Sequence, residues 1–280
     1  MTVDPTTAIG SSSEPSEGPG WLGLEPAEGP GRYSFTLTHS LARFDGKLFG
    51  GTGLAIAVAA LEAETGRGAL WLTVQFVGSA DLGERIDCHV EVLASGRSTS
   101  QVRFTATVGD RLVLAALGAT AQQRDDGFGA RLGRMPEVSA PEESPPLELG
   151  FPVSLEVISR QGPFAMADYR RATGAAAAAG ADLVWARMRT VRQSRSTVAY
   201  LADFVPSAVV RAAGRVGGGT SLDNSIRFGP AVPPGTDWLL IDNDPYLADN
   251  GYVHGGARLW SADGVLLGVA SQTAVARFVD

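Results

Sequence analysis

Three polar side chains near the C-terminal end have the residue types needed to hold a reactive water molecule. Asp223 interrupts the alternating apolar run 221–228, and Gln272 ends the apolar hairpin 260–272. Tyr246 lies between them in the chain. A carboxylate can accept a proton from water, and an amide and a phenol can fix that water by hydrogen bonds. We therefore predict that Asp223, Tyr246 and Gln272 meet in space around one water molecule.

Other kinds of site fit the sequence less well. The Gly-x-Ser-x-Gly elbow of serine hydrolases does not occur. The three histidines, His39, His89 and His254, lack the spacing of metal ligands, so we expect no metal site and no cofactor. Asp203 falls on a predicted helix, and we interpret it as an acid in the N-terminal turn that interacts with the helix dipole.

A buried helix is the clearest element of the first half. Residues 54–64 are apolar on almost every side and are followed by Gly66. A helix that is apolar all round must be enclosed by other parts of the protein, and a glycine directly after it is a typical stop signal. Strand-like runs follow at residues 69–77, 85–94, 98–108 and 112–122.

The second half repeats this order after a change in composition. Residues 124–149 contain Asp-Asp-Gly, Met-Pro and Pro-Glu-Glu-Ser-Pro-Pro, which is typical of a linker. A helix is predicted at about 198–213, with Ser196 or Thr197 as its N-cap. Pro206 then marks either a kink or the true start of that helix.

The predicted organisation therefore has four parts. Residues 1–30 are rich in Ser, Glu, Pro and Gly and are expected to form a disordered tail. A first folded unit spans 31–123, and the linker spans 124–149. A second unit spans 150–280, begins with a strand at 151–158 and carries the site.

The two halves match with a nearly constant offset. Phe76 and Phe228 each end a strand after the helix, an offset of 228 − 76 = 152. The turns at Asp110 and Asp263 are offset by 263 − 110 = 153. Such self-similarity indicates an internal duplication. Each unit is then a helix wrapped by an antiparallel sheet, and the two sheets join edge to edge.

The duplication also contrasts the predicted site with the first half. Trp71 falls opposite Asp223, and Ala119 falls opposite Gln272. A lone acid among apolar neighbours costs stability unless it is hydrogen-bonded. The polar residues of the second half are therefore a sign of function there.

Composition limits the classes of protein. The chain has 280 residues, a net charge of −7 and a pI of about 5.1, so nucleic acid is not an expected partner. The single cysteine, Cys88, cannot form an intrachain disulfide, which is compatible with a reducing compartment. No apolar run reaches the ~18 residues of a membrane span, and the N-terminal residues lack a signal-peptide pattern. We therefore expect a soluble, cytoplasmic protein with no membrane partner.

Together these features resemble the type II, TesB-like acyl-CoA thioesterases. The resemblance is carried by Gly50-Gly51 before the buried helix, by Leu222-Asp223-Asn224-Ser225 in a strand, and by the hairpin from Asp263 to Gln272. It covers about residues 35–280 apart from the linker. It implies an α+β double-hotdog fold, an acyl-CoA substrate, and hydrolysis of a fatty or other acyl-CoA thioester to a free acid and CoA, as in fatty acid metabolism.

The resemblance also implies roles for individual residues. The family holds its attacking water with an Asp, a Thr or Ser, and a Gln, which places Asp223 and Gln272 as two of the three. Counting through the intervening strand puts Tyr246 at the hydroxyl position, where the family has a smaller side chain. Gly50 and Gly51 either supply N–H donors for an oxyanion or permit close helix–sheet packing.

Two alternatives stay open at this point. The first is a double hotdog that binds acyl-CoA or an acyl chain without hydrolysing it. The second concerns assembly, because one double unit can stand alone or pair further as a homo-oligomer.

Overall fold

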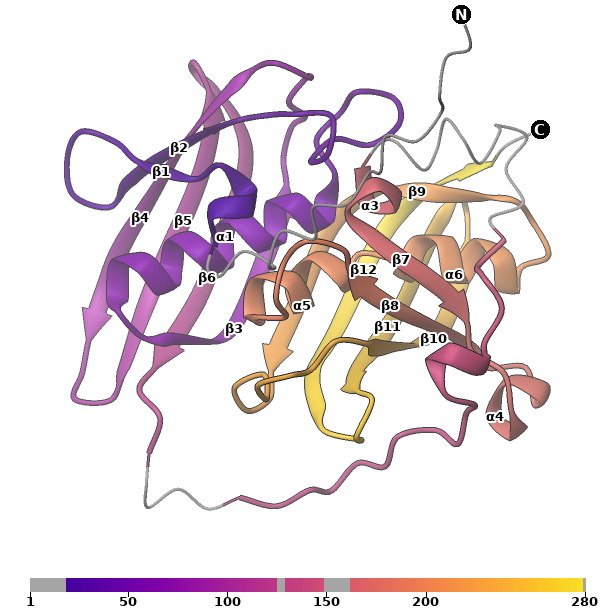
Figure 1. Cartoon of the computed structure of the whole chain (residues 1–280). Helices are drawn as coiled ribbons and strands as arrows, with labels where there is room; N and C mark the ends of the chain where they lie inside the picture. The colour runs from indigo at the N-terminus through magenta and orange to yellow at the C-terminus, as the bar shows by residue number, and fades with distance from the viewer. Residues whose placement is uncertain (1–18, 125–128, 149–161, 279–280) are drawn as a thin grey trace, which may run out of the picture.

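A single antiparallel sheet of 12 strands runs through the computed structural model, which describes residues 19–124, 129–148 and 162–278 (Figure 1). The strand order is β1-β2-β4-β5-β6-β3-β9-β12-β11-β10-β8-β7. At its centre, β3 (Gly68–Phe76) pairs with β9 (Gly217–Phe228). The order on one side of this junction mirrors the order on the other. The predicted double-hotdog architecture is therefore confirmed.

The remaining strands divide between the halves of the chain. The first half supplies β1 (Glu25–Pro26), β2 (Arg32–Thr36), β4 (Arg85–Ser95), β5 (Thr99–Val108) and β6 (Arg111–Ala121). The second half supplies β7 (Ala167–Arg171), β8 (Asp182–Met188), β10 (Leu239–Asp249), β11 (Tyr252–Ser261) and β12 (Leu266–Phe278). Short helices are η1 (Pro19–Leu22), η2 (Pro141–Glu143), α3 (Gly162–Met166) and α4 (Ala175–Ala178).

Some predicted segments fall at the limits of the description. The strand predicted at 151–158 and residues 1–18 of the predicted tail lie outside the described residues. Residues 19–30, which we had assigned to the tail, contain η1 and β1, and Leu22 is buried in the core. The part of the linker that is described includes the turn of η2.

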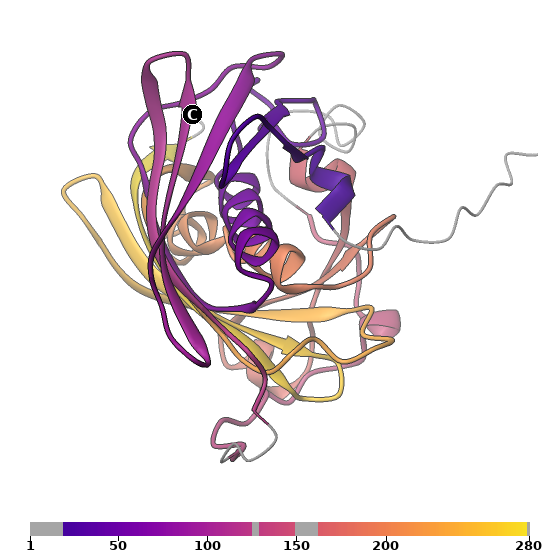
Figure 2. The same ribbon diagram turned by 90° about the vertical axis from the view of Figure 1, so that its left-hand side faces the viewer.

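The helix α1 (Gly50–Thr65) is enclosed, as its apolar sequence predicts. All of its residues from Gly50 to Leu61 are buried. Gly66 ends it in the left-handed conformation (φ 63°), where a glycine has no side chain to clash. Figure 2 shows α1 on the concave side of the curved sheet, next to the second half's helices. The helix begins at Gly50, four residues before the predicted start at Leu54, because the glycine run is part of its first turn.

The second predicted helix is two helices, α5 (Arg195–Leu201) and α6 (Val205–Ala212). Ser194 caps α5, and its side chain and that of Thr197 form a reciprocal capping box. Pro206 lies in the first turn of α6, where its missing N–H breaks no helical hydrogen bond. Asp203 lies in the break between these two helices and not inside either of them.

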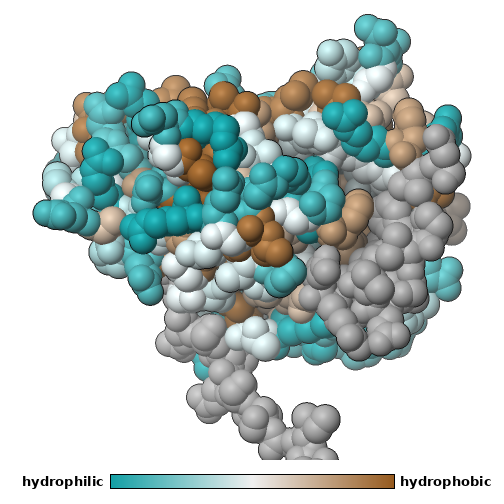
Figure 3. Space-filling view, turned by 90° about the horizontal axis from the view of Figure 1, so that it is seen from above, coloured by the Kyte–Doolittle hydropathy of each residue, from teal (hydrophilic) through white to brown (hydrophobic). Residues whose placement is uncertain are grey.

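The two halves share one core. A single cluster of buried apolar residues includes α1, α5, α6 and the inner faces of strands from both halves. At the junction of β3 and β9, the hydroxyl oxygens of Thr73 and Ser225 lie 2.7 Å apart. The surface is mixed: on the face in Figure 3, apolar residues are scattered among polar ones. Among the described residues, no helix is both long and apolar enough to cross a membrane.

Candidate active site

Gln272 contacts an acid that the sequence analysis had placed in another role. Its side-chain Nε2 donates hydrogen bonds to Asp203 Oδ1 at 2.5 Å and to Ser221 Oγ at 2.7 Å. The Ser221 hydroxyl in turn donates to Asp203 Oδ1 at 3.4 Å. Gln272 is buried, and the Asp203 carboxylate is surrounded by protein atoms although the residue keeps some exposure. An acid, a hydroxyl and an amide therefore form one connected group.

The first half of the chain reaches this group through the start of α1. The Gly51 N–H donates to Asp203 Oδ2 at 2.9 Å, so the positive end of the α1 dipole faces the carboxylate. A Cβ at Gly50 would lie 2.4 Å from Asp203 Oδ2, and one at Gly51 would lie 2.3 Å from the Tyr200 carbonyl oxygen. Two residues without side chains are thus required for α1 to approach Asp203 this closely.

Burial makes the Asp203 carboxyl group a weaker acid than an ordinary aspartate. Removal of the carboxylate from water raises the pKa of Asp203 from its ordinary 3.8 to about 6. The hydrogen bonds from Gln272, Gly51 and Ser221 and the charge of Arg43 oppose this rise. At neutral pH the side chain is ionised, and it is more basic than an ordinary aspartate. These are the properties required of a general base that acts on water.

A bulge in β9 brings Ser221 to the same side of the sheet. In the β9–β12 ladder Thr273 pairs with Asp223, but Ala274 pairs with Ser221, so Leu222 is an extra residue. An extra residue reverses the alternation of side chains beyond it. Ser221 therefore faces the interior, as Asn224 does, and meets Gln272.

The structure does not bring the three predicted residues together. Asp223 lies one position from Asn224, the residue that pairs with Gln272 in the ladder, so its side chain is on the other face. Its Oδ1 accepts a hydrogen bond from the Thr273 backbone N–H at 2.9 Å, at the bulge. Tyr246 lies on β10 and is 63% exposed. Of the three, Gln272 alone is hydrogen-bonded to the Asp203 group.

Sequence reasoning missed Asp203, although the repeat contained a signal. The offset 203 − 51 = 152 equals the offset between Phe76 and Phe228. Extending the repeat from the strands to the helices would have set Asp203 opposite Gly51. The interpretation of Asp203 as an acid near a helix N-terminus agrees with its contact, but the helix concerned is α1 and not its own.

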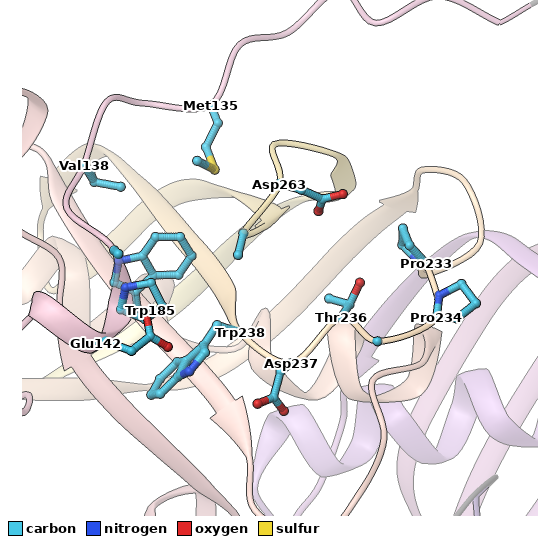
Figure 4. Close-up of a pocket in the computed structure, with 14 residues that line it drawn as sticks. Met135, Val138, Glu142, Trp185, Pro233, Pro234, Thr236, Asp237, Trp238 and Asp263 are labelled. Atoms are coloured by element: carbon cyan, nitrogen blue, oxygen red, sulfur yellow. The ribbon is translucent and has the colours of Figure 1, made fainter.

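The second half also carries an open cleft on a different part of its surface. The cleft has a volume of about 570 Å³ and lies between the linker, the middle of β8, the loop before β10 and the turn after β11 (Figure 4). Trp185, Trp238 and Asp237 are among its lining residues, and none of the Asp203 group is. Elsewhere in the described residues, no group of three or more His, Cys, Asp or Glu side chains is placed to share a metal ion.

Comparison with models of protein families shows the family to which the chain belongs. The model of the acyl-CoA thioesterase N-terminal domain matches residues 39–122, and that of the C-terminal domain matches residues 136–276. The chain belongs to the acyl-CoA thioesterase family. The resemblance to acyl-CoA thioesterases, inferred above from three motifs, is thereby confirmed. Comparison with curated proteins gives no match.

Solved structures agree with this membership of the acyl-CoA thioesterase family. A protein of Novosphingobium aromaticivorans, provisionally assigned as a thioesterase, is 30% identical with a TM-score of 0.79, over 91% of this chain and 98% of its own. An acyl-CoA thioesterase II of Mycobacterium marinum is 19% identical (TM-score 0.71; 92% and 97% covered). A hot dog protein of Alicyclobacillus acidocaldarius is 20% identical (TM-score 0.76; 92% and 97% covered). The latter two show the fold alone.

Proposed function

We propose that this member of the acyl-CoA thioesterase family hydrolyses acyl-CoA thioesters with Asp203 as the general base. The observation that carries the proposal is the Asp203 carboxylate, which is buried, has a pKa of about 6 and is held by donors from α1, β9 and β12. Ser221 and Gln272 fix the orientation of that carboxylate and of the water next to it. General-base help of this kind typically contributes about 10²–10⁴-fold to the rate.

The proposed reaction has two steps. Asp203 accepts a proton from water while the water oxygen bonds to the thioester carbonyl carbon, and the carbonyl π electrons move to its oxygen. The carbonyl then re-forms, the C–S bond breaks, and the proton held by Asp203 passes to the departing CoA sulfur. The products are a free acid and CoA with its thiol restored, and Asp203 is ionised again.

The site predicted from sequence, Asp223 with Tyr246 and Gln272, is the alternative proposal. Asp203→Asn and Asp223→Asn form a matched pair, because each exchanges one carboxylate for an amide of the same shape. Thiol release should be measured for both variants and the wild type over acyl-CoA substrates of short, medium and long chains. We expect Asp203→Asn to lose about 10²–10⁴-fold in kcat, and Asp223→Asn to stay close to the wild type.

Each other outcome has a definite meaning. Loss of activity in Asp223→Asn alone would favour the sequence-based site, and Tyr246→Phe would then test the phenol. Equal background rates in all three proteins would contradict hydrolysis. Saturable binding of acyl-CoA in that case would favour a binding protein.

A further inference from the structure

A second amide side chain, that of Asn224, lies beside Gln272, and the reaction proposed above gives it no role. Asn224 is fully buried on the inner face of β9, and it pairs with Gln272 of β12 on one side and with Val74 of β3 on the other. Neither its Nδ2 nor its Oδ1 has a hydrogen-bond partner among the described residues. Gln272 Oε1 is likewise without one there.

A buried amide without partners lowers the stability of a folded protein, because it loses its bonds to water and gains none in return. A residue of this kind in a native protein calls for an explanation by a bound molecule or a chemical role. Its neighbours on the same inner face of the sheet are of another kind, since Val74 and Ile226 are apolar and fully buried.

The duplication shows that the fold itself does not require an amide here. Position 224 corresponds to position 224 − 152 = 72 in the first half, which holds a fully buried leucine. The β3–β9 ladder supports this correspondence, because Leu72 pairs with Ile226 just as Val74 pairs with Asn224. A leucine therefore packs in the same place in the half that lacks the acid.

We propose that Asn224 contacts the substrate, and that its side-chain N–H donates a hydrogen bond to the carbonyl oxygen of the acyl thioester. The inference rests on the proposed function of the Asp203 site and names a further group in it. The nearby donors are already engaged, since Gln272 Nε2 bonds Asp203 and Ser221, and the Gly51 N–H bonds Asp203. Asn224 Nδ2 is a donor next to Gln272 on the inner face of the sheet, and neither of its hydrogens has a partner among the described residues, so both can bind a ligand.

The bond would strengthen during the reaction. When water adds to the carbonyl carbon, negative charge develops on the carbonyl oxygen, and a pre-positioned N–H in a site shielded from water stabilises that charge. Removal of one such donor typically lowers kcat by about 10²–10³-fold. The effect should fall on kcat more than on KM, because the charge exists only in the transition state.

Asn224→Leu is the test variant, since Leu72 shows that leucine fits. Asn243→Leu is the matched control, because Asn243 is also a buried asparagine of this sheet but its Nδ2 is bonded to Asp182 Oδ2 at 3.2 Å. We expect Asn224→Leu to keep or raise the unfolding temperature while kcat falls about 10²–10³-fold. Asn243→Leu should lose stability and keep kcat per folded molecule.

A binding measurement separates this contact from the catalytic proposal. Two CoA compounds that cannot be hydrolysed serve as probes: a ketone analogue, in which a methylene replaces the sulfur, and an S-alkyl-CoA, which has no carbonyl. Calorimetry should show that Asn224→Leu weakens binding of the ketone, about tenfold for one lost hydrogen bond of ~1.4 kcal/mol, and leaves the S-alkyl compound unchanged.

The results that would overturn the inference are equally definite. They are a kcat within threefold of the wild type, an equal loss of affinity for both probes, or an unfolding temperature that drops as in Asn243→Leu. If the wild type shows no hydrolysis, the proposed function fails, but the comparison of the two probes still decides whether Asn224 contacts the carbonyl.

Discussion

Replacement of Gln272 by leucine should move the pH dependence of catalysis toward alkaline pH. Burial raises the pKa of Asp203 to about 6 against the opposing effect of the hydrogen bond that the Gln272 amide donates. A hydrogen bond to a charged group contributes about 1.5–3 kcal/mol, and one pKa unit corresponds to about 1.36 kcal/mol. In Gln272→Leu we therefore expect the midpoint to rise by about 1–2 units, to about 7–8 from the wild-type value of about 6.

The profile of kcat/KM against pH measures this midpoint, because it reports ionisation in the free enzyme. A base with a pKa of about 6 is ionised in only about a tenth of molecules at pH 5, so the wild-type value there should be about a tenth of the plateau. Thiol release can be followed at acid pH with a dithiopyridine reagent. The plateau of Gln272→Leu will also be lower, because the amide holds Ser221, but the midpoint is read independently of the plateau height.

Gln101→Leu is the control, since Gln101 is an exposed glutamine on β5 of the first half. Its midpoint and plateau should both match the wild type. A midpoint in Gln272→Leu that stays at the wild-type value, or moves to lower pH, would refute the reasoning that Asp203 is the base and that Gln272 tunes it.

Two further expectations concern the Asp203 group, and a third concerns the buried cysteine. Gly50→Ala should reduce kcat strongly, because its methyl would lie 2.4 Å from Asp203 Oδ2, whereas Gly129→Ala, with nothing within 4 Å, should leave kcat unchanged. The folded pKa of Asp203 is about 6 against an ordinary 3.8, so the stability of the wild type relative to Asp203→Asn should fall by up to about 3 kcal/mol as pH rises from about 4 to 7 in denaturant titrations. Cys88 is buried with its pKa raised to about 12, so iodoacetamide at neutral pH should label it only on unfolding.

The predictable part of the fold is the part that local patterns determine. The all-round apolar character of residues 54–64 and the glycine that follows them indicate a buried, terminated helix wherever that helix packs. Alternation and turn residues likewise predicted β4, β5 and β6, with every boundary within one residue of the observed one. The constant offset between the halves then supplied the topology, because a duplicated unit constrains both copies at once.

The contacts of Asp203 depend on features that such patterns do not contain. Which residue of β9 faces inward is decided by the extra residue Leu222, and one inserted residue reverses the face of every side chain beyond it. Asp223 was favoured because it is a lone acid among apolar neighbours and because the family resemblance assigned it the role of the Asp that holds the water. Asp203 gains its partners from α1, β9 and β12, which are distant from one another in sequence, and α1 belongs to the other half of the chain.

The duplication also explains why the group of Asp203, Ser221 and Gln272 occurs once among the described residues. Gly51 and Asp203 are 152 residues apart and bonded to each other, as are Thr73 and Ser225 across the β3–β9 junction. Equivalent residues that touch must lie close to the axis relating the halves. An acid at both 51 and 203 would set two carboxylates in contact, and the repulsion would keep one of them protonated. With glycine at 51 there is only one carboxylate, and the Gly51 backbone N–H donates to it, so Asp203 is ionised at neutral pH.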